Sequence, residues 1–116
     1  MDADSDERDT DRVVILGELR GEITVFERLQ VKDMGRGGAL VETRFPLHLN
    51  SLHDLRLALG SQSIVLKGRV THCHISEVAQ DVVTYQSDLE FVEPSDRIVV
   101  VIAEFLNALR SKRRNA

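Results

Sequence analysis

The sequence predicts an all-β fold, a six-stranded antiparallel, split β-barrel followed by one C-terminal α-helix. Three observations lead to this prediction. Segments in which apolar and polar residues alternate recur about six times, as expected for half-buried strands. Turn residues separate them at hairpin-length intervals, which favours antiparallel pairing into a closed barrel. After Pro94 the apolar residues recur at helical spacing instead.

The composition is that of one globular domain with an aliphatic core. The chain has 116 residues, of which 42% are hydrophobic, 29% are charged and only 4% are aromatic. No apolar run approaches the roughly 20 residues of a membrane-spanning helix, and the acidic N-terminus is unlike a signal peptide. The single cysteine, Cys73, cannot form an internal disulfide, in agreement with a reducing compartment. We therefore expect a cytoplasmic protein with no membrane partner.

The first strands are less regular than the later ones. Residues 13–26 indicate one long or broken strand, with Gly17 and Gly21 as candidate bulge sites. Residues 26–28 are typical of a turn. Residues 29–33 follow as a short second strand, in which Leu29, Val31 and Asp33 have the same parity and are expected to share a face.

A glycine-rich turn then interrupts the pattern at residues 34–38, where three of the last four residues are glycine. Glycine adopts backbone angles that other residues resist, so we expect special φ values here. Such a turn also brings backbone N–H groups close to a ligand, as a small nest that accepts an anion. A third strand resumes at residues 39–43, and a longer connection ends near Ser51.

The second half of the chain predicts three more strands and the helix. Alternation predicts strands that include residues 55–59, 64–71 and 83–91, with a hairpin turn at residues 60–62 and a polar connection at residues 76–81. Pro94, Ser95 and Asp96 supply helix start signals. The apolar residues at helical spacing are Ile98, Val101, Ile102, Phe105 and Leu109. We expect Val99, Val100 and Leu106 to be exposed and to pack on the barrel or on a second copy, so the chain is a monomer or a homodimer.

Charge divides the chain into three parts. Residues 1–11 form an acidic arm, which we expect to be flexible, residues 12–110 form the barrel and helix, and residues 111–116 form a basic tail. The formal net charge is -4, whereas domains that bind nucleic acid usually carry a net positive charge. We therefore expect no nucleic-acid partner.

The sequence His72-Cys73-His74 is rich in metal-ligating side chains, but it lies in a predicted strand. Because successive side chains of a strand point to opposite faces, these three residues cannot converge on one ion. We therefore predict no metal site and no cofactor.

Two motifs indicate a ligand site. Arg8 and Arg12 form an R-x-x-x-R pair before the first strand, and Asp33 begins the turn that ends at Gly38. In this respect the chain resembles the PilZ family, bacterial domains that bind cyclic di-GMP. The family pattern is R-x-x-x-R, about twenty residues, and then D/N-x-S-x-x-G, so Gly35 stands where the family has serine.

The resemblance spans about residues 8–109 and extends to the strands that follow the motifs. The segments that carry it are residues 38–41, 67–70 and 88–91, in the last of which Asp88 stands where glycine is expected. It implies a receptor or adaptor for cyclic di-GMP in bacterial second-messenger signalling, with an unidentified signalling protein as partner. The ligand-binding residues that it implies are Arg8, Arg12, Asp33, Gly35 and Gly38, and we add Arg36 because of its charge within the turn.

The chemistry of these residue types suits such a ligand. An arginine fork bonds bidentately to guanine O6 and N7 or to phosphate oxygens, and its plane stacks on a base. A carboxylate such as Asp33 accepts from guanine N–H groups. Arg36 adds a positive charge within the turn, whereas Gly35 lacks the hydroxyl of serine.

Two other classes of function compete with this one. The first is an interaction module with the same fold that binds no nucleotide, an alternative favoured by Gly35 and by the acidic arm around Arg8 and Arg12. The second is an enzyme. The sequence offers no nucleophile–base–orienter set and no phosphate loop of the P-loop kind, so we predict that the protein is not an enzyme.

Overall fold

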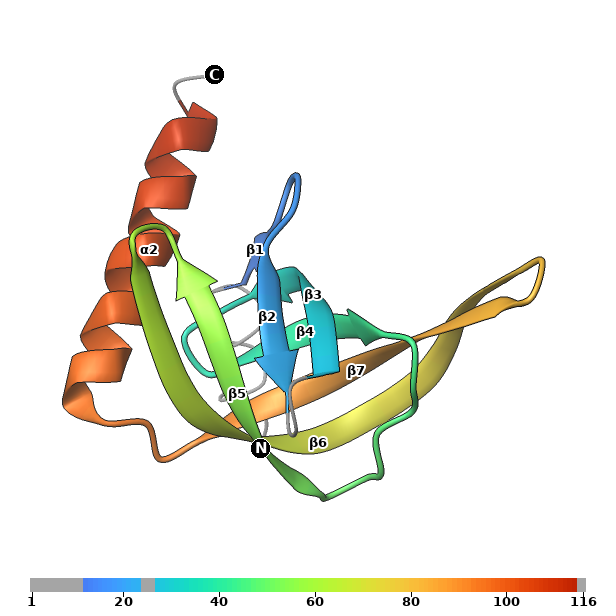
Figure 1. Cartoon of the computed structure of the whole chain (residues 1–116). Helices are drawn as coiled ribbons and strands as arrows, with labels where there is room; N and C mark the ends of the chain where they lie inside the picture. Colours follow the sequence, from blue (N-terminus) through green and yellow to red (C-terminus); the bar gives the residue numbers. More distant parts are fainter. Residues whose placement is uncertain (1–11, 24–26, 115–116) are drawn as a thin grey trace, which may run out of the picture.

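A computed structural model describes residues 12–23 and 27–114 (Figure 1). In this part of the chain seven strands precede one helix. The strands are β1 (Val13–Val14), β2 (Arg20–Ile23), β3 (Glu27–Met34), β4 (Gly38–Thr43), β5 (Leu52–Leu59), β6 (Gln62–Ala79) and β7 (Val82–Val92), and the helix is α2 (Asp96–Arg114). The helix thus continues into the segment that was assigned above to a basic tail.

Six of the strands close into an antiparallel barrel, as predicted from the sequence. The order β3-β2-β5-β6-β7-β4 is completed by pairing of β4 with β3. The short strand β1 is additional and pairs with the last two residues of β3. Residues 13–23 are therefore a broken strand, and Gly17 lies in the break with a φ of 91°.

The core is aliphatic and lies inside the barrel. Alternate residues are buried in β5, in the first half of β6 and in the second half of β7, in agreement with the sequence pattern. The helix lies beside the β5–β6 hairpin in Figure 1 and contacts β1 and β6. Val101, Ile102 and Leu106 of α2 are buried in the core. The expectation that Leu106 is exposed was wrong, whereas Val99 and Val100 are indeed exposed.

The bulges lie elsewhere than expected. Gly21 pairs regularly with Leu29 and Leu57, so it is not a bulge. The register shifts instead in β3, between Val31 and Asp33, where one extra residue reverses the alternation. As a result Met34 is fully buried, and Asp33 does not share the inner face of Leu29 and Val31.

Strand β6 is longer than the sequence indicated. Residues 76–79, predicted as part of a connection, belong to β6, and the hairpin closes at Gln80 and Asp81, where Gln80 has a φ of 57°. The register with β7 shifts twice, between Val70 and His72 and again between Ile75 and Glu77. These shifts break the alternation that reveals a strand. Residues 27 and 28, expected in a turn, likewise belong to β3.

The helix begins where its start signals lie. The Ser95 hydroxyl accepts a hydrogen bond from the Ile98 N–H at 3.3 Å, and the Ser95 carbonyl accepts one from the Val99 N–H. Among the described residues, no helix has both the length and the apolar character needed to cross a membrane.

Candidate functional site

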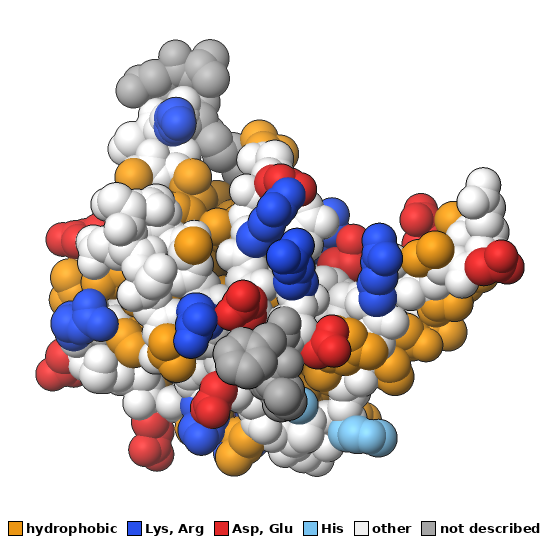
Figure 2. Space-filling model, in the orientation of Figure 1, with side chains coloured by type: hydrophobic (Ala, Val, Ile, Leu, Met, Phe, Trp, Pro, Cys, Tyr) orange, Lys and Arg blue, Asp and Glu red, His pale blue; other side chains and the backbone are white. Residues whose placement is uncertain are grey.

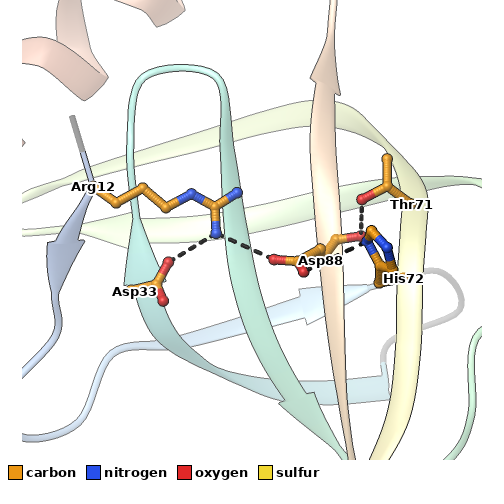
Figure 3. Close-up of polar contacts among 5 residues, drawn as sticks. All are labelled: Arg12, Asp33, Thr71, His72 and Asp88. Carbon is orange, nitrogen blue, oxygen red and sulfur yellow. Dashed lines mark hydrogen bonds and ion pairs between the residues drawn. The ribbon is translucent and has the colours of Figure 1, made fainter. Parts of the chain in front are cut away.

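The outer face of the barrel carries one arginine between two carboxylates (Figure 3). Arg12 Nη1 donates to Asp33 Oδ1 at 3.0 Å and to Asp88 Oδ1 at 3.2 Å. Arg12 lies directly before β1, Asp33 near the end of β3 and Asp88 within β7. We call these three residues the Arg12–Asp33–Asp88 cluster.

Strand register brings the two carboxylates to the same level of the barrel wall. Asp33 of β3 pairs with Leu40 of β4, Leu40 pairs with Asp88 of β7, and Asp88 pairs with His72 of β6. Directly paired residues have their side chains on the same face, so these four form one row across four strands. Pairing of Val14 with Asp33 extends this row to β1, and Arg12 lies two residues before Val14.

The glycine turn lies against the side chain of Arg12. A Cβ added at Gly35 would lie 3.0 Å from Arg12 Cγ, so a serine here would require the Arg12 side chain to shift slightly. A Cβ at Gly38 would collide with the Leu89 carbonyl oxygen and would lie 3.3 Å from Arg12 Nη2. Neither glycine has a φ in the left-handed region, so that expectation was wrong for both. They permit close approach instead.

Hydrogen bonds fix the turn to itself and to β7. The Gly35 N–H donates to the Gly38 carbonyl at 2.9 Å, and the Gly37 carbonyl accepts from the Phe91 N–H at 2.9 Å. The N–H of Gly35 is therefore engaged within the turn, and it does not take part in the anion nest that we expected. The turn therefore lies beside Arg12 with its backbone bonded to itself and to β7.

The structure brings together four of the six predicted ligand-binding residues. Arg12, Asp33, Gly35 and Gly38 are in contact or adjacent, as described above. Arg8 and the arm predicted for residues 1–11 lie outside the described residues. Arg36, the sixth residue, is exposed and lies on the helix side of the turn. It lines a hollow of about 220 Å³ together with four residues of α2, Ala103, Leu106, Asn107 and Arg110.

The cluster is partly buried and carries an excess of negative charge. The exposed fractions of the side chains are 17% for Arg12, 24% for Asp33 and 36% for Asp88, so solvent screens these ion pairs less than it screens fully exposed ones. Arg12 Nε is buried and has no hydrogen-bond partner within the described residues. The guanidinium therefore retains unused donor capacity.

Asp88 is the member of the cluster that was not among the predicted site residues. It is further held by Thr71, whose hydroxyl donates to the Asp88 carbonyl at 3.3 Å, and its Oδ2 lies 3.9 Å from His72 Nδ1. The sequence did contain a signal, because Asp88 stands where the family resemblance predicts glycine. Its contact with Arg12 required the tertiary structure.

A second polar group, in the β4–β5 connection and at the start of β5, is arranged as a turn. His53 Nε2 lies 2.7 Å from Ser51 Oγ, and the Ser51 hydroxyl itself donates to the His48 carbonyl. His53 is therefore the donor toward Ser51, the reverse of what a general base requires. Burial lowers the pKa of His53 from 6.5, the nearby Asp54 carboxylate opposes this, and His48 adds to the lowering.

The histidines and the cysteine of residues 72–74 are arranged as the strand pattern predicted. His72 and His74 are exposed, and Cys73, which lies between them, is half-buried against the core. Within residues 12–23 and 27–114, no three or more His, Cys, Asp or Glu side chains are placed so that they could hold a metal ion.

No family model and no curated protein matches the chain. Solved structures resemble it, among them these two. The PilZ domain of YcgR from Escherichia coli with c-di-GMP has a TM-score of 0.73 at 12% identity, over 90% of this chain and 92% of that one. MrkH from K. pneumonia in its apo state has a TM-score of 0.69 at 22% identity, over 89% of this chain and 52% of that one. This chain thus spans about half of the MrkH chain. At these identities the likeness shows the fold.

Proposed function

Because the chain has the fold of a PilZ domain, we propose that it is a receptor for cyclic di-GMP, with the nucleotide bound over the Arg12–Asp33–Asp88 cluster. The observation that carries the proposal is the position of Arg12, held by Asp33 against the glycine turn on the outer face of the barrel. The proposed function is regulatory: the bound receptor passes the signal to a partner protein, in bacterial cytoplasm.

The proposed binding step is an exchange of partners at Arg12. A phosphate, or the O6 and N7 atoms of guanine, replaces the Asp88 carboxylate as acceptor for the guanidinium. Asp33 accepts from guanine N–H groups, and Arg8 adds positive charge around the phosphates. An exposed ion pair contributes about 0–1 kcal/mol, and this partly buried one somewhat more, so the exchange carries only a modest cost.

Calorimetric titration of the whole chain with cyclic di-GMP tests the proposal. We expect saturable binding with a dissociation constant of the order of 1–10 μM, about -8 to -7 kcal/mol. Cyclic di-AMP is the matched control ligand, because it has the same phosphates but lacks guanine O6, and we expect it to bind at least about tenfold more weakly. Absence of heat with about 0.5 mM cyclic di-GMP would contradict the proposal.

Replacing Asp88 with asparagine should increase the affinity for cyclic di-GMP. The substitution keeps the size of the side chain but removes a negative charge that both holds Arg12 and repels phosphate. We expect a gain of about threefold to tenfold by calorimetry, equivalent to about 0.7–1.4 kcal/mol. Asp54→Asn is the control, because Asp54 is a 73% exposed aspartate of β5 that pairs with Lys67. A weaker affinity in Asp88→Asn would show that Asp88 helps to bind the nucleotide.

One observation favours the second candidate function, a protein-interaction module that binds no nucleotide. Two carboxylates already hold Arg12, and Gly35 leaves the turn without the serine hydroxyl of the family motif. In such a module the cluster only connects β1 to the barrel. The titration separates the two candidates, since the module gives no heat with either cyclic dinucleotide.

A further inference from the structure

The β6–β7 hairpin projects beyond the barrel wall (Figure 1). β5 pairs with β6 only as far as Arg69, and β4 pairs with β7 only from Tyr85 onward. We call residues 71–79 of β6 and residues 82–84 of β7 the hairpin extension. Among the described residues, the extension has no strand on either outer side. The backbone groups along its edges therefore offer unused pairing capacity.

Apolar side chains lie along one face of this projection. Val83 and Tyr85 have the same parity as the buried Ser87 and Leu89, so they continue the inner face of the barrel. Their partners across the hairpin are Val78 and Ile75, which are 65% and 57% exposed.

This projection is a solvent-exposed surface. Figure 2 shows hydrophobic side chains along it. An exposed edge strand with an apolar face is a ready template for pairing with another strand.

We propose that two copies of the chain associate through the hairpin extension, by antiparallel pairing of residues 72–79 of β6 about a two-fold axis. The argument is self-complementarity. If the axis passes between Ile75 and Ser76, His74 of each copy lies opposite Glu77 of the other, and Cys73 lies opposite Val78. The same His74–Glu77 contact therefore forms twice in the dimer, once on each side of the axis.

The second bulge of β6 makes these opposed side chains share a face. His74 pairs with Gln86 and Glu77 with Thr84, so both point away from the barrel interior. Without the extra residue Ser76, residues 74 and 77 would have opposite orientations and could not meet across the axis. The bulge therefore allows the edge of β6 to pair with the same edge of a second copy while His74 and Glu77 face each other.

The size of the edge determines the expected strength of association. Eight paired residues span about 26 Å of strand and bury less surface than the roughly 800 Å² per partner of a standard stable interface. We expect a reversible dimer that dissociates between about 1 μM and about 1 mM, and sedimentation velocity over this concentration range measures it.

Charge reversal tests the proposed register. Glu77→Lys places a cation opposite His74, and we expect the dimer to weaken by about tenfold. The double variant His74→Glu with Glu77→Lys places an acid opposite a base across the axis, so we expect its dimerisation to return to that of the parent. His74 and Glu77 are exposed, so these variants retain the barrel, which their melting temperatures check. Glu104→Lys, an exposed reversal on α2, is the control and leaves dimerisation unchanged.

Three results would overturn the proposal. The first is that the parent chain stays monomeric at about 1 mM. The second is that a dimer forms but Glu77→Lys leaves it intact, which would locate the interface elsewhere, such as at the exposed Val99 and Val100 of α2. The third is that the double variant is as weakly dimeric as the single one, which would exclude the antiparallel register.

Discussion

Replacing Arg12 with alanine is expected to weaken binding of cyclic di-GMP at least a hundredfold while leaving the barrel folded. Each hydrogen bond from a charged group contributes about 1.5–3 kcal/mol, and the variant loses the fork that would make two of them with the nucleotide. The barrel persists because Arg12 precedes β1 and lies outside the closed ring of strands. Calorimetry measures the affinity, and thermal unfolding verifies the fold.

Two further variants separate charge from geometry at this position. Arg12→Lys keeps the positive charge but loses the planar fork, so we expect an affinity between those of the parent and Arg12→Ala. Arg56→Ala is the control, because Arg56 is an exposed arginine of β5 that pairs with Glu22 at 3.4 Å. If Arg12→Ala bound the nucleotide as tightly as the parent, the ligand would not lie over the Arg12–Asp33–Asp88 cluster.

Replacing Gly38 with alanine is expected to destabilise the barrel by about 2–3 kcal/mol, the upper range for overpacking. The added Cβ would collide with the Leu89 carbonyl oxygen, a backbone atom that cannot rotate away. To relieve this clash, β4 and β7 must separate where Gly38 pairs with Glu90, which opens the barrel between these two strands. Urea unfolding measures the loss of the free energy of unfolding.

Gly35→Ala is the matched comparison for Gly38→Ala. It adds the same methyl group to the same turn, but the nearest atom is Arg12 Cγ at 3.0 Å, in a flexible side chain. We expect a cost of about 1 kcal/mol or less, since Arg12 can adjust. Equal stability of the two variants would mean that the β4–β7 contact at Gly38 is looser than the structure indicates.

Much of the fold was predictable because barrel strands with one buried face alternate strictly. Leu55, Leu57 and Leu59 of β5 are buried while their neighbours are exposed, and the helix begins at the capping residue Ser95 that the sequence indicated. The errors arose at bulges. In β3 one extra residue buried Met34 instead of Asp33, and in β6 the register shift between Ile75 and Glu77 interrupts the alternation where residues 76–79 were predicted as a polar connection.

The candidate site was predictable only in part. The motif spacing led to Arg12, Asp33, Gly35 and Gly38, which the structure brings together. The sequence did not predict why Gly35 and Gly38 are glycines. The reason is the close approach of Arg12 and of the Leu89 carbonyl oxygen, not a local requirement for a positive φ. Arg36 was grouped with them because of its charge within the turn, yet it lines a hollow beside α2.

By itself the sequence determined the properties that depend on near neighbours: which segments alternate, where the helix starts and where the chain carries glycine. Only the tertiary structure decided which carboxylates hold Arg12. Asp33 is 21 residues away and Asp88 is 76, and both reach the same guanidinium because β3, β4 and β7 pair in one register. Register depends on the packing of the whole barrel, so no local pattern contains it. The glycine that the family resemblance predicted at position 88 is an aspartate, and barrel closure places that aspartate against Arg12.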